Sequence, residues 1–171
     1  MTRTNIAAVA AYVAAIVTAN LLVAEYGPSV TIINAFVLIG LDLTLRDYLH
    51  DTWHDHRLRN MAALIVGAGV LSYALNPAAG RIALASSVAF VLAASVDWGV
   101  YTAAARWPWL ARSNASNVAG AAVDSVVFPA LAFGWPLLIP IVAGQFIAKV
   151  TGGAVWSLVM TGLRGRVAAH H

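Results

Sequence analysis

The chain alternates between long apolar stretches and short connections that carry charges, prolines or glycines. None of the stretches shows the strict two-residue alternation of a half-buried strand, and their length favours helices. Six apolar helices are expected, at about residues 6–24, 29–45, 61–75, 82–105, 113–134 and 137–163. The pattern predicts an all-α protein with a single domain over residues 1–171.

Composition places these helices in a membrane. Hydrophobic residues make up 61% of the chain and charged residues 10%, whereas a soluble domain is about 25% charged. A chain with so few charges cannot cover its surface with polar groups, which predicts a polytopic integral membrane protein with six transmembrane helices. The first stretch exceeds a typical signal-peptide core, so we expect a retained helix. The chain has no cysteine, which excludes disulfides and thiolate metal sites.

The basic residues predict the orientation of these helices. With six crossings both termini share one side, and of the ten Lys and Arg residues the opposite side receives only Arg81, while Lys149 lies inside the last stretch. The other eight fall on the side of the termini: Arg3, Arg46, Arg57, Arg59, Arg106, Arg112, Arg164 and Arg166. By the positive-inside rule, both termini lie in the cytoplasm and the protein is a multi-pass component of the inner membrane.

The fifth stretch carries an aspartate, Asp124, near its middle. Placing a carboxylate at that depth costs about 2.5 kcal/mol or more, so it must face other helices or water. Polar, small and aromatic residues recur around it at helical spacing and share one face: Asn117, Gly120, Ala121, Asp124, Ser125 and Phe128. In the sixth stretch Gln145, Lys149, Gly152 and Trp156 also share a face. Because Asp124 and Lys149 both fall near midspan, we expect them to pair, directly or through water or a substrate.

Two further stretches carry polar stripes. Phe90, Asp97 and Tyr101 align in the fourth, and Asn34, Leu38 and Asp42 in the second, with Arg46 one turn further on. These charges are interpreted either as structural ion pairs or as the lining of a polar cavity. Four helices with one stripe each favour a central cavity, because isolated ion pairs would need fewer groups.

A histidine-rich segment lies between the second and third stretches. Its titratable residues are His50, Asp51, His54, Asp55 and His56. His50 and His54 have the spacing to bind a metal on one helix face, but arginines surround them, and we interpret the segment as a solvated loop rather than a metal site. No hydrolase constellation or phosphate-binding glycine loop is present, so we expect neither an enzyme nor a cofactor, and no nucleic-acid partner.

Several segments together resemble the queuosine precursor transporter family, also called the vitamin uptake transporter family. The resemblance covers nearly the whole chain and rests on Ala19–Val23, Asp42–Arg46, Arg81–Ser86, Asp97, Lys149 and, most specifically, Ser113–Phe128 with its Asn117…Asp124-Ser125…Phe128 pattern. The chain departs from the family pattern at Asp47–His50, where an aromatic-glycine pair is expected.

The resemblance implies a six-helix carrier that imports 7-cyano-7-deazaguanine and 7-aminomethyl-7-deazaguanine. A carboxylate accepts both donors of a guanine-like edge, so Asp124 or Asp97 is expected to read the base. Coupling to a proton or ion and assembly into a homo-oligomer are left open. The expected substrate-binding residues are Asp42, Arg46, Phe90, Asp97, Asn117, Asp124, Ser125, Phe128, Gln145, Lys149 and Trp156.

Two alternatives are compatible with the sequence. The first is a substrate-binding subunit of an energy-coupling-factor vitamin importer, which needs a partner membrane protein and ATPases. The second is a membrane scaffold that transports nothing and binds no deazapurine.

Overall fold

A computed structural model of the chain describes residues 3–42, 45, 49, 53 and 57–168. These residues form helices and short connections, without a strand among them. The elements in chain order are α1 (Arg3–Tyr26), the 3-10 turn η1 (Gly27–Val30), α2 (Thr31–Asn34), the π-helical turn η2 (Ala35–Ile39), α4 (Arg57–Leu75), the 3-10 turn η4 (Pro77–Ala79), α5 (Gly80–Ala103), α6 (Trp109–Phe133) and α7 (Ile139–Ala168). The all-α prediction is confirmed for the part of the chain that is described.

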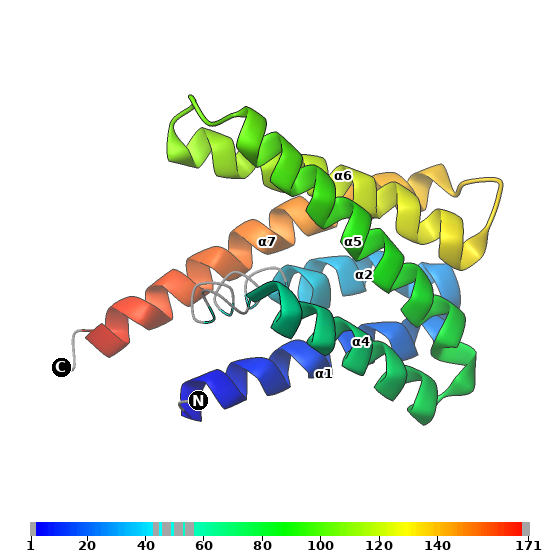
Figure 1. Ribbon diagram of the computed structural model, residues 1–171. Coiled ribbons are helices and arrows are strands. Elements are labelled where there is room, and N and C mark those ends of the chain that lie inside the picture. The colour runs from blue at the N-terminus through cyan, green and yellow to red at the C-terminus, as the bar shows by residue number, and fades with distance from the viewer. Residues whose placement is uncertain (1–2, 43–44, 46–48, 50–52, 54–56, 169–171) are drawn as a thin grey trace.

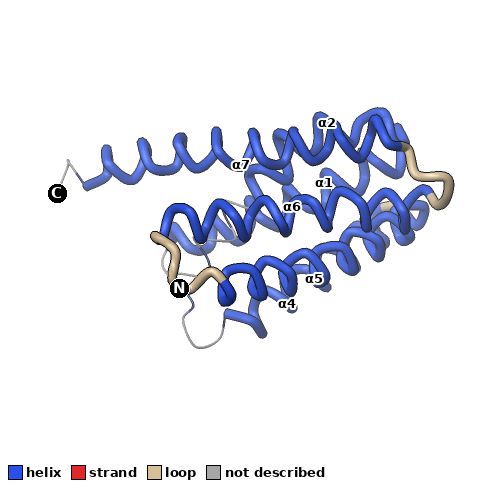
Figure 2. The backbone as a smooth tube through the Cα atoms, turned by 90° about the horizontal axis from the view of Figure 1, so that it is seen from above, coloured by secondary structure: helices blue, strands red, loops and turns tan. Residues whose placement is uncertain are grey.

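The helices lie side by side along one common direction (Figures 1 and 2). The start of α1, the end of α7 and the α5–α6 connection lie at one end, which we call the termini end. The α1–α2, α4–α5 and α6–α7 connections lie at the other, which we call the turn end. Each helix therefore runs from one end to the other, and depth in the bundle can be followed by residue number.

The first apolar run reverses direction within one continuous helical stretch, Asn5–Asp42. Gly27 has a φ of 68°, a left-handed conformation that only glycine adopts without strain. Thr31 Oγ1 donates to the Pro28 carbonyl oxygen at 2.7 Å, which fixes the turn. Asn34 Nδ2 then donates to the Ala19 carbonyl oxygen at 3.2 Å, from the returning arm to the outgoing one. The run is thus two antiparallel arms, α1 and α2–η2.

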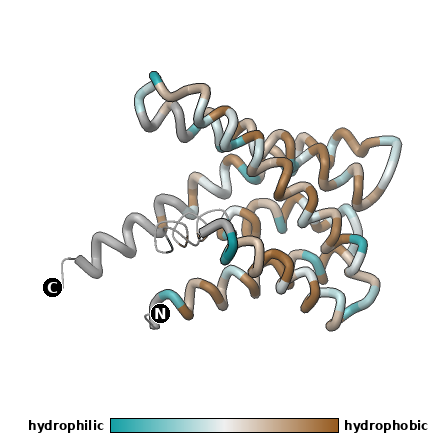
Figure 3. The backbone as a smooth tube through the Cα atoms, viewed as in Figure 1, coloured by the Kyte–Doolittle hydropathy of each residue, from teal (hydrophilic) through white to brown (hydrophobic). Residues whose placement is uncertain are grey.

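Four helical segments are long and apolar enough to cross a membrane: Asn5–Asp42, Pro77–Ala103, Asn114–Phe133 and Ile139–Trp156. Arg59–Leu75 is a shorter apolar helix. Hydrophobic positions run along every helix, with hydrophilic ones scattered between them (Figure 3). This makes the chain an integral membrane protein. The prediction of six crossings with cytoplasmic termini fits two arms in the first segment, but it stays a prediction.

Two glycine contacts set the closest helix approaches. A Cβ on Gly120 of α6 would lie 3.4 Å from the Ala93 carbonyl oxygen and 3.4 Å from Asp97 Cβ of α5. A Cβ on Gly152 of α7 would collide with the Phe36 carbonyl oxygen in η2. Small residues allow such backbone contact in membrane helices, where packing rather than hydrophobicity drives association. These contacts define two close helix pairs. One is α5–α6, and the other is α7 with the α2–η2 arm, which we call α2–α7 for short.

Candidate functional site

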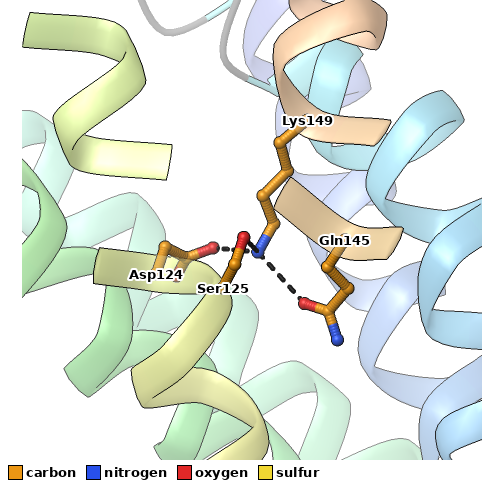
Figure 4. Close-up of polar contacts among 4 residues, drawn as sticks. All are labelled: Asp124, Ser125, Gln145 and Lys149. Atoms are coloured by element: carbon orange, nitrogen blue, oxygen red, sulfur yellow. Dashed lines mark hydrogen bonds and ion pairs between the residues drawn. The ribbon is translucent and has the colours of Figure 1, made fainter. Parts of the chain in front are cut away.

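A buried ion pair joins α6 to α7 near the centre of the bundle. Lys149 Nζ lies 2.5 Å from Asp124 Oδ2, and the two side chains are 4% and 22% exposed. Lys149 Nζ also donates to Gln145 Oε1 at 3.1 Å and to Ser125 Oγ at 3.4 Å (Figure 4). An ammonium group has three N–H donors, and these three acceptors satisfy all of them. The predicted pairing of Asp124 with Lys149 is confirmed.

Helix geometry explains why these four residues meet. Gln145 and Lys149 are one turn apart on α7, so their side chains lie on one face. Asp124 and Ser125 are neighbours on α6, and Pro129 follows within the same helix. Proline has no N–H, so the Ser125 carbonyl lacks its usual donor four residues on. Yet α6 continues through Pro129 to Phe133 and keeps Asp124 opposite α7.

A cavity of about 310 Å³, which we call the large cavity, opens beside the ion pair. Its volume falls within the range of about 300–1,000 Å³ typical of small-molecule sites. Six of the predicted site residues line it: Asp42, Phe90, Asp97, Asn117, Asp124 and Lys149. The sequence-derived interpretation of a central polar cavity fits this arrangement better than isolated ion pairs do.

Asp97 is the carboxylate on the α5 wall of the large cavity. Its Oδ1 atom is buried and has no hydrogen-bond partner among the described residues. Asp124 Oδ2, in contrast, is held by Lys149. Because a buried polar atom without a partner is costly, Asp97 Oδ1 is an acceptor available to a donor that enters the cavity.

A smaller cavity of about 40 Å³, which we call the small cavity, lies on the other side of the ion pair. Four predicted residues line it: Asp124, Phe128, Gln145 and Lys149. Phe128 packs edge-to-face on Phe133, with ring centroids 6.0 Å apart. Gln145 is 1% exposed, and its Nε2 has no hydrogen-bond partner in the described part of the chain.

Two predicted site residues of the described structure, Ser125 and Trp156, do not line either cavity. Ser125 is 1% exposed and acts through its contact with Lys149. Trp156 Nε1 donates to the Val37 carbonyl oxygen at 3.0 Å, so this ring joins α7 to η2. Arg46 lies outside the described residues, as do His50, His54 and His56 of the histidine-rich segment.

Sequence reasoning missed several cavity residues. Ser86, Ser87 and Asn114 line the large cavity, and Asn20 and Thr31 line the small one. Asn34, which belonged to the predicted polar stripe of the second stretch, lines the small cavity as well. Ser86 had a signal, because it continues the helical stripe of Phe90, Ala93 and Asp97 by one turn towards the N-terminus. The amides of Asn20 and Asn34 were visible inside apolar stretches, but nothing in the sequence placed them beside Gln145.

Comparison with curated proteins and with solved structures gives no match. A comparison with protein families does: residues 3–163 match the family described as putative vitamin uptake transporter. The match covers nearly all of the chain. The match also agrees with the apolar helices and with the large cavity among them, whose wall carries Asp97, Asp124 and Lys149. The chain therefore belongs to this family of membrane transporters.

Proposed function

We propose that the protein imports queuosine precursors, 7-cyano-7-deazaguanine and 7-aminomethyl-7-deazaguanine, by alternating access across the cytoplasmic membrane. The observation that carries the proposal is the large cavity, where a buried carboxylate oxygen of Asp97 without a partner faces the same space as the Asp124–Lys149 ion pair. A flat heterocycle with adjacent donors and acceptors fits this set of groups.

The guanine-like edge of these bases carries two adjacent donors, N1–H and an exocyclic amine, next to a carbonyl acceptor. A carboxylate accepts two such donors. Of the two candidate readers, Asp97 has a free acceptor oxygen and Asp124 is already bound to Lys149. Asp97 is therefore the base reader in this arrangement. Asn117 offers an amide for the carbonyl edge, and Phe90 offers a ring on which the base stacks.

The proposal includes six membrane crossings of this chain. α5 has 24 residues, which span about 36 Å at 1.5 Å per residue and exceed the roughly 30 Å hydrocarbon core. The two arms of Asn5–Asp42, the shorter helix Arg59–Leu75 and the three remaining candidates give an even number of crossings. An even number agrees with the start of α1 and the end of α7 lying at one end (Figure 1). The arginine distribution assigns the cytoplasm to that end.

Uptake of radiolabelled 7-cyano-7-deazaguanine tests this proposal, first in cells without their own importer and then in liposomes that contain only the purified chain. We expect uptake by the wild type and a loss of about tenfold or more for Asp97→Asn, because one strong charge-assisted pair of hydrogen bonds becomes weaker and mismatched. Ser95→Ala is the matched control: Ser95 is an exposed residue of the same helix that bonds only its own backbone, to Val91 O.

Wild-type uptake by Asp97→Asn, or no uptake by any form, contradicts the proposal. Uptake in cells but not in liposomes indicates dependence on partner proteins, as in an energy-coupling-factor importer. A thermal-shift screen against 7-deazaguanines, guanine and vitamins then identifies the class of ligand. A scaffold protein would show no shift with any of them.

A further inference from the structure

The large and small cavities share part of their walls. Ile39, Ser86, Asp124 and Lys149 line both of them. The Asp124–Lys149 ion pair, together with Ile39 and Ser86, therefore separates the two cavities. No other feature of the described residues places a charged contact between two enclosed spaces.

Residue order along each helix shows which cavity lies nearer which end. On α6 the large cavity is lined from Asn114 to Asp124 and the small one from Asp124 to Phe128. On α1 the corresponding residues are Ile16 for the large cavity and Ala19 to Val23 for the small one. Because α1 and α6 both run from the termini end to the turn end (Figure 1), the small cavity is nearer the turn end.

The antiparallel helices show the same order in reverse. On α7, which starts at the turn end, Gln145 lines the small cavity and Gly153 the large one, with Lys149 in both. On the α2–η2 arm Thr31 lines the small cavity and Asp42 the large one. Asn114 and Asn117, which line the large cavity, are exposed, so this cavity reaches the surface on the side of the termini end. The two cavities thus follow one another along a single path through the bundle.

The walls of the small cavity carry several polar side chains although they are buried. Asn20, Thr31 and Asn34 are each at most 4% exposed, and Gln145 is 1% exposed. Side-chain amides inside apolar helices are costly unless they face other polar groups. Asn20 and Asn34 each use an amide donor, towards Ser72 and Ala19 respectively. Gln145 Nε2 is a donor without a partner among the described residues and points away from Lys149 (Figure 4). The cavity therefore suits a hydrogen-bond acceptor.

We propose that the substrate binds first in the large cavity and then at a second position in the small cavity, and that the Asp124–Lys149 ion pair is the gate between these two positions. This inference rests on the proposed function and extends it. When the pair separates, Asp124 offers its carboxylate to the donor edge of the base, and Gln145 Nε2 donates to the carbonyl of the same base. At about 40 Å³ the small cavity exceeds the roughly 10–15 Å³ that one water molecule requires, but it is far below the range of about 300–1,000 Å³ of small-molecule sites. The base therefore fits only when separation of the pair joins the small cavity to the large one.

The physical reason for a gate at this position is that the hydrogen-bonding capacity of the Lys149 ammonium group is filled within the closed pair and its neighbours. All three of its donors are used within the cluster of Asp124, Ser125 and Gln145. The pair stays closed unless another polar group replaces one of these contacts, and a base with both donors and acceptors can do so. A ligand shifts a two-state equilibrium only by its difference in affinity for the two states, and the contacts with Asp124 and Gln145 exist only in the open state.

Single-cysteine labelling tests the gate directly, because the chain has no native cysteine. Val23 lines the small cavity and is 4% exposed, so V23C reports access to that space. A membrane-impermeant thiol reagent is added from the side of the termini end, where the large cavity reaches the surface. V23C is labelled in an otherwise wild-type chain and in chains that also carry Lys149→Met or Asp124→Asn. If the open state is populated at 10% or less in the wild type, breaking the pair raises the labelling rate about tenfold or more.

Two further single-cysteine variants control for correct membrane insertion and for the side of the membrane from which the reagent reacts. Trp135 is 79% exposed in the α6–α7 connection, so W135C reacts from the turn end in every background that inserts correctly. N114C, from the large cavity, reacts from the opposite side. If Lys149→Met lowers W135C labelling, the nearly isosteric Asp124→Asn background replaces it, since this variant keeps the side-chain shape.

V23C labelling that is equally slow with the pair intact or broken, while W135C reacts normally, overturns the gate. Fast V23C labelling in the wild-type background also overturns it. Addition of saturating 7-cyano-7-deazaguanine to the intact pair is expected to raise the V23C rate as well. If the ligand has no effect but Asp124→Asn does, the gate stands and the proposed substrate fails. If the ligand is taken up but the rate never changes, the substrate stands and the gate fails.

Discussion

The two close helix pairs of this protein, α5–α6 and α2–α7, are held together in different ways. In α5–α6 the contact at Gly120 is tight but leaves room for a neighbour to adjust, at 3.4 Å. In α2–α7 the backbones touch at Gly152, and Trp156 adds a hydrogen bond to Val37 in the π-helical turn. The Asp124–Lys149 ion pair joins one helix pair to the other. A motion that separates the pairs therefore breaks polar contacts, for which a ligand can substitute, and leaves the backbone packing intact.

The largest effect is expected from removal of one partner of the ion pair. Asp124→Ala leaves the Lys149 ammonium, 4% exposed, without its counter-charge, and loss of one partner from a buried pair costs about 3–5 kcal/mol of unfolding free energy. Lys149→Met is expected to cost less, because Asp124 is 22% exposed and lines a cavity that water can enter. Thermal and denaturant unfolding in detergent measure both variants.

The double variant Asp124→Ala with Lys149→Met sharpens this comparison. It carries no buried charge, so its loss of stability should be smaller than the sum of the two single losses. Equal losses for Asp124→Ala and Lys149→Met, or strict additivity, would show that the pair does not link the two halves as described.

An intermediate effect on stability is expected from alanine substitutions at Gly152 and Gly120, whose surroundings differ in how closely they are packed. Gly152→Ala forces a Cβ against the Phe36 carbonyl oxygen, and overpacking of this kind costs about 1–3 kcal/mol. Gly120→Ala is the matched variant: its Cβ meets neighbours at 3.4 Å, and alanine gains up to about 1 kcal/mol of helix propensity over glycine. Melting temperatures of the two variants should therefore fall in the order Gly120→Ala above Gly152→Ala. The reverse order would show that α5–α6 is the less tolerant pair.

The smallest effect is expected at Trp156. Trp156→Phe removes the hydrogen bond to the Val37 carbonyl oxygen and keeps most of the ring, at a cost of about 1 kcal/mol. Trp98→Phe is the control, because Trp98 is 71% exposed. The affinity for the transported base should be the same in Trp156→Phe as in the wild type. A large loss of affinity would restore the substrate-binding role that the sequence alone had suggested for this ring.

Much of the fold could be predicted from the sequence because each long helix coincides with one apolar stretch. Gly27–Pro28, Asn76–Pro77 and Pro108 separate these stretches by local turn chemistry, which needs no knowledge of neighbours. The Asp124–Lys149 pair could also be predicted, since two opposite charges at matching depth in a membrane have few other partners. The helix ends shifted by a few residues, as at α6, which begins directly after Pro108.

What could not be predicted depends on which helices are neighbours. The small cavity combines amides from α1 and α2 with Gln145 of α7, and a single sequence does not show that these helices adjoin. In a membrane the lipid-facing side is as apolar as the packed side, so periodicity does not reveal the packed face of a helix. For the same reason the ring of Trp156 was assigned to the substrate, although its Nε1 bonds the π-helical turn.

The ion pair also has a consequence for biosynthesis. Ribosomes make α6 before α7, so Asp124 enters the membrane before the lysine that neutralises it has been translated. During that interval the nascent helix carries an uncompensated carboxylate, which costs about 2.5–3.5 kcal/mol near the bilayer centre. Insertion of α7 brings Lys149 and removes this penalty. A chain truncated within the α6–α7 connection would keep this penalty permanently. Its uncompensated charge would make it a target of membrane-protein quality control.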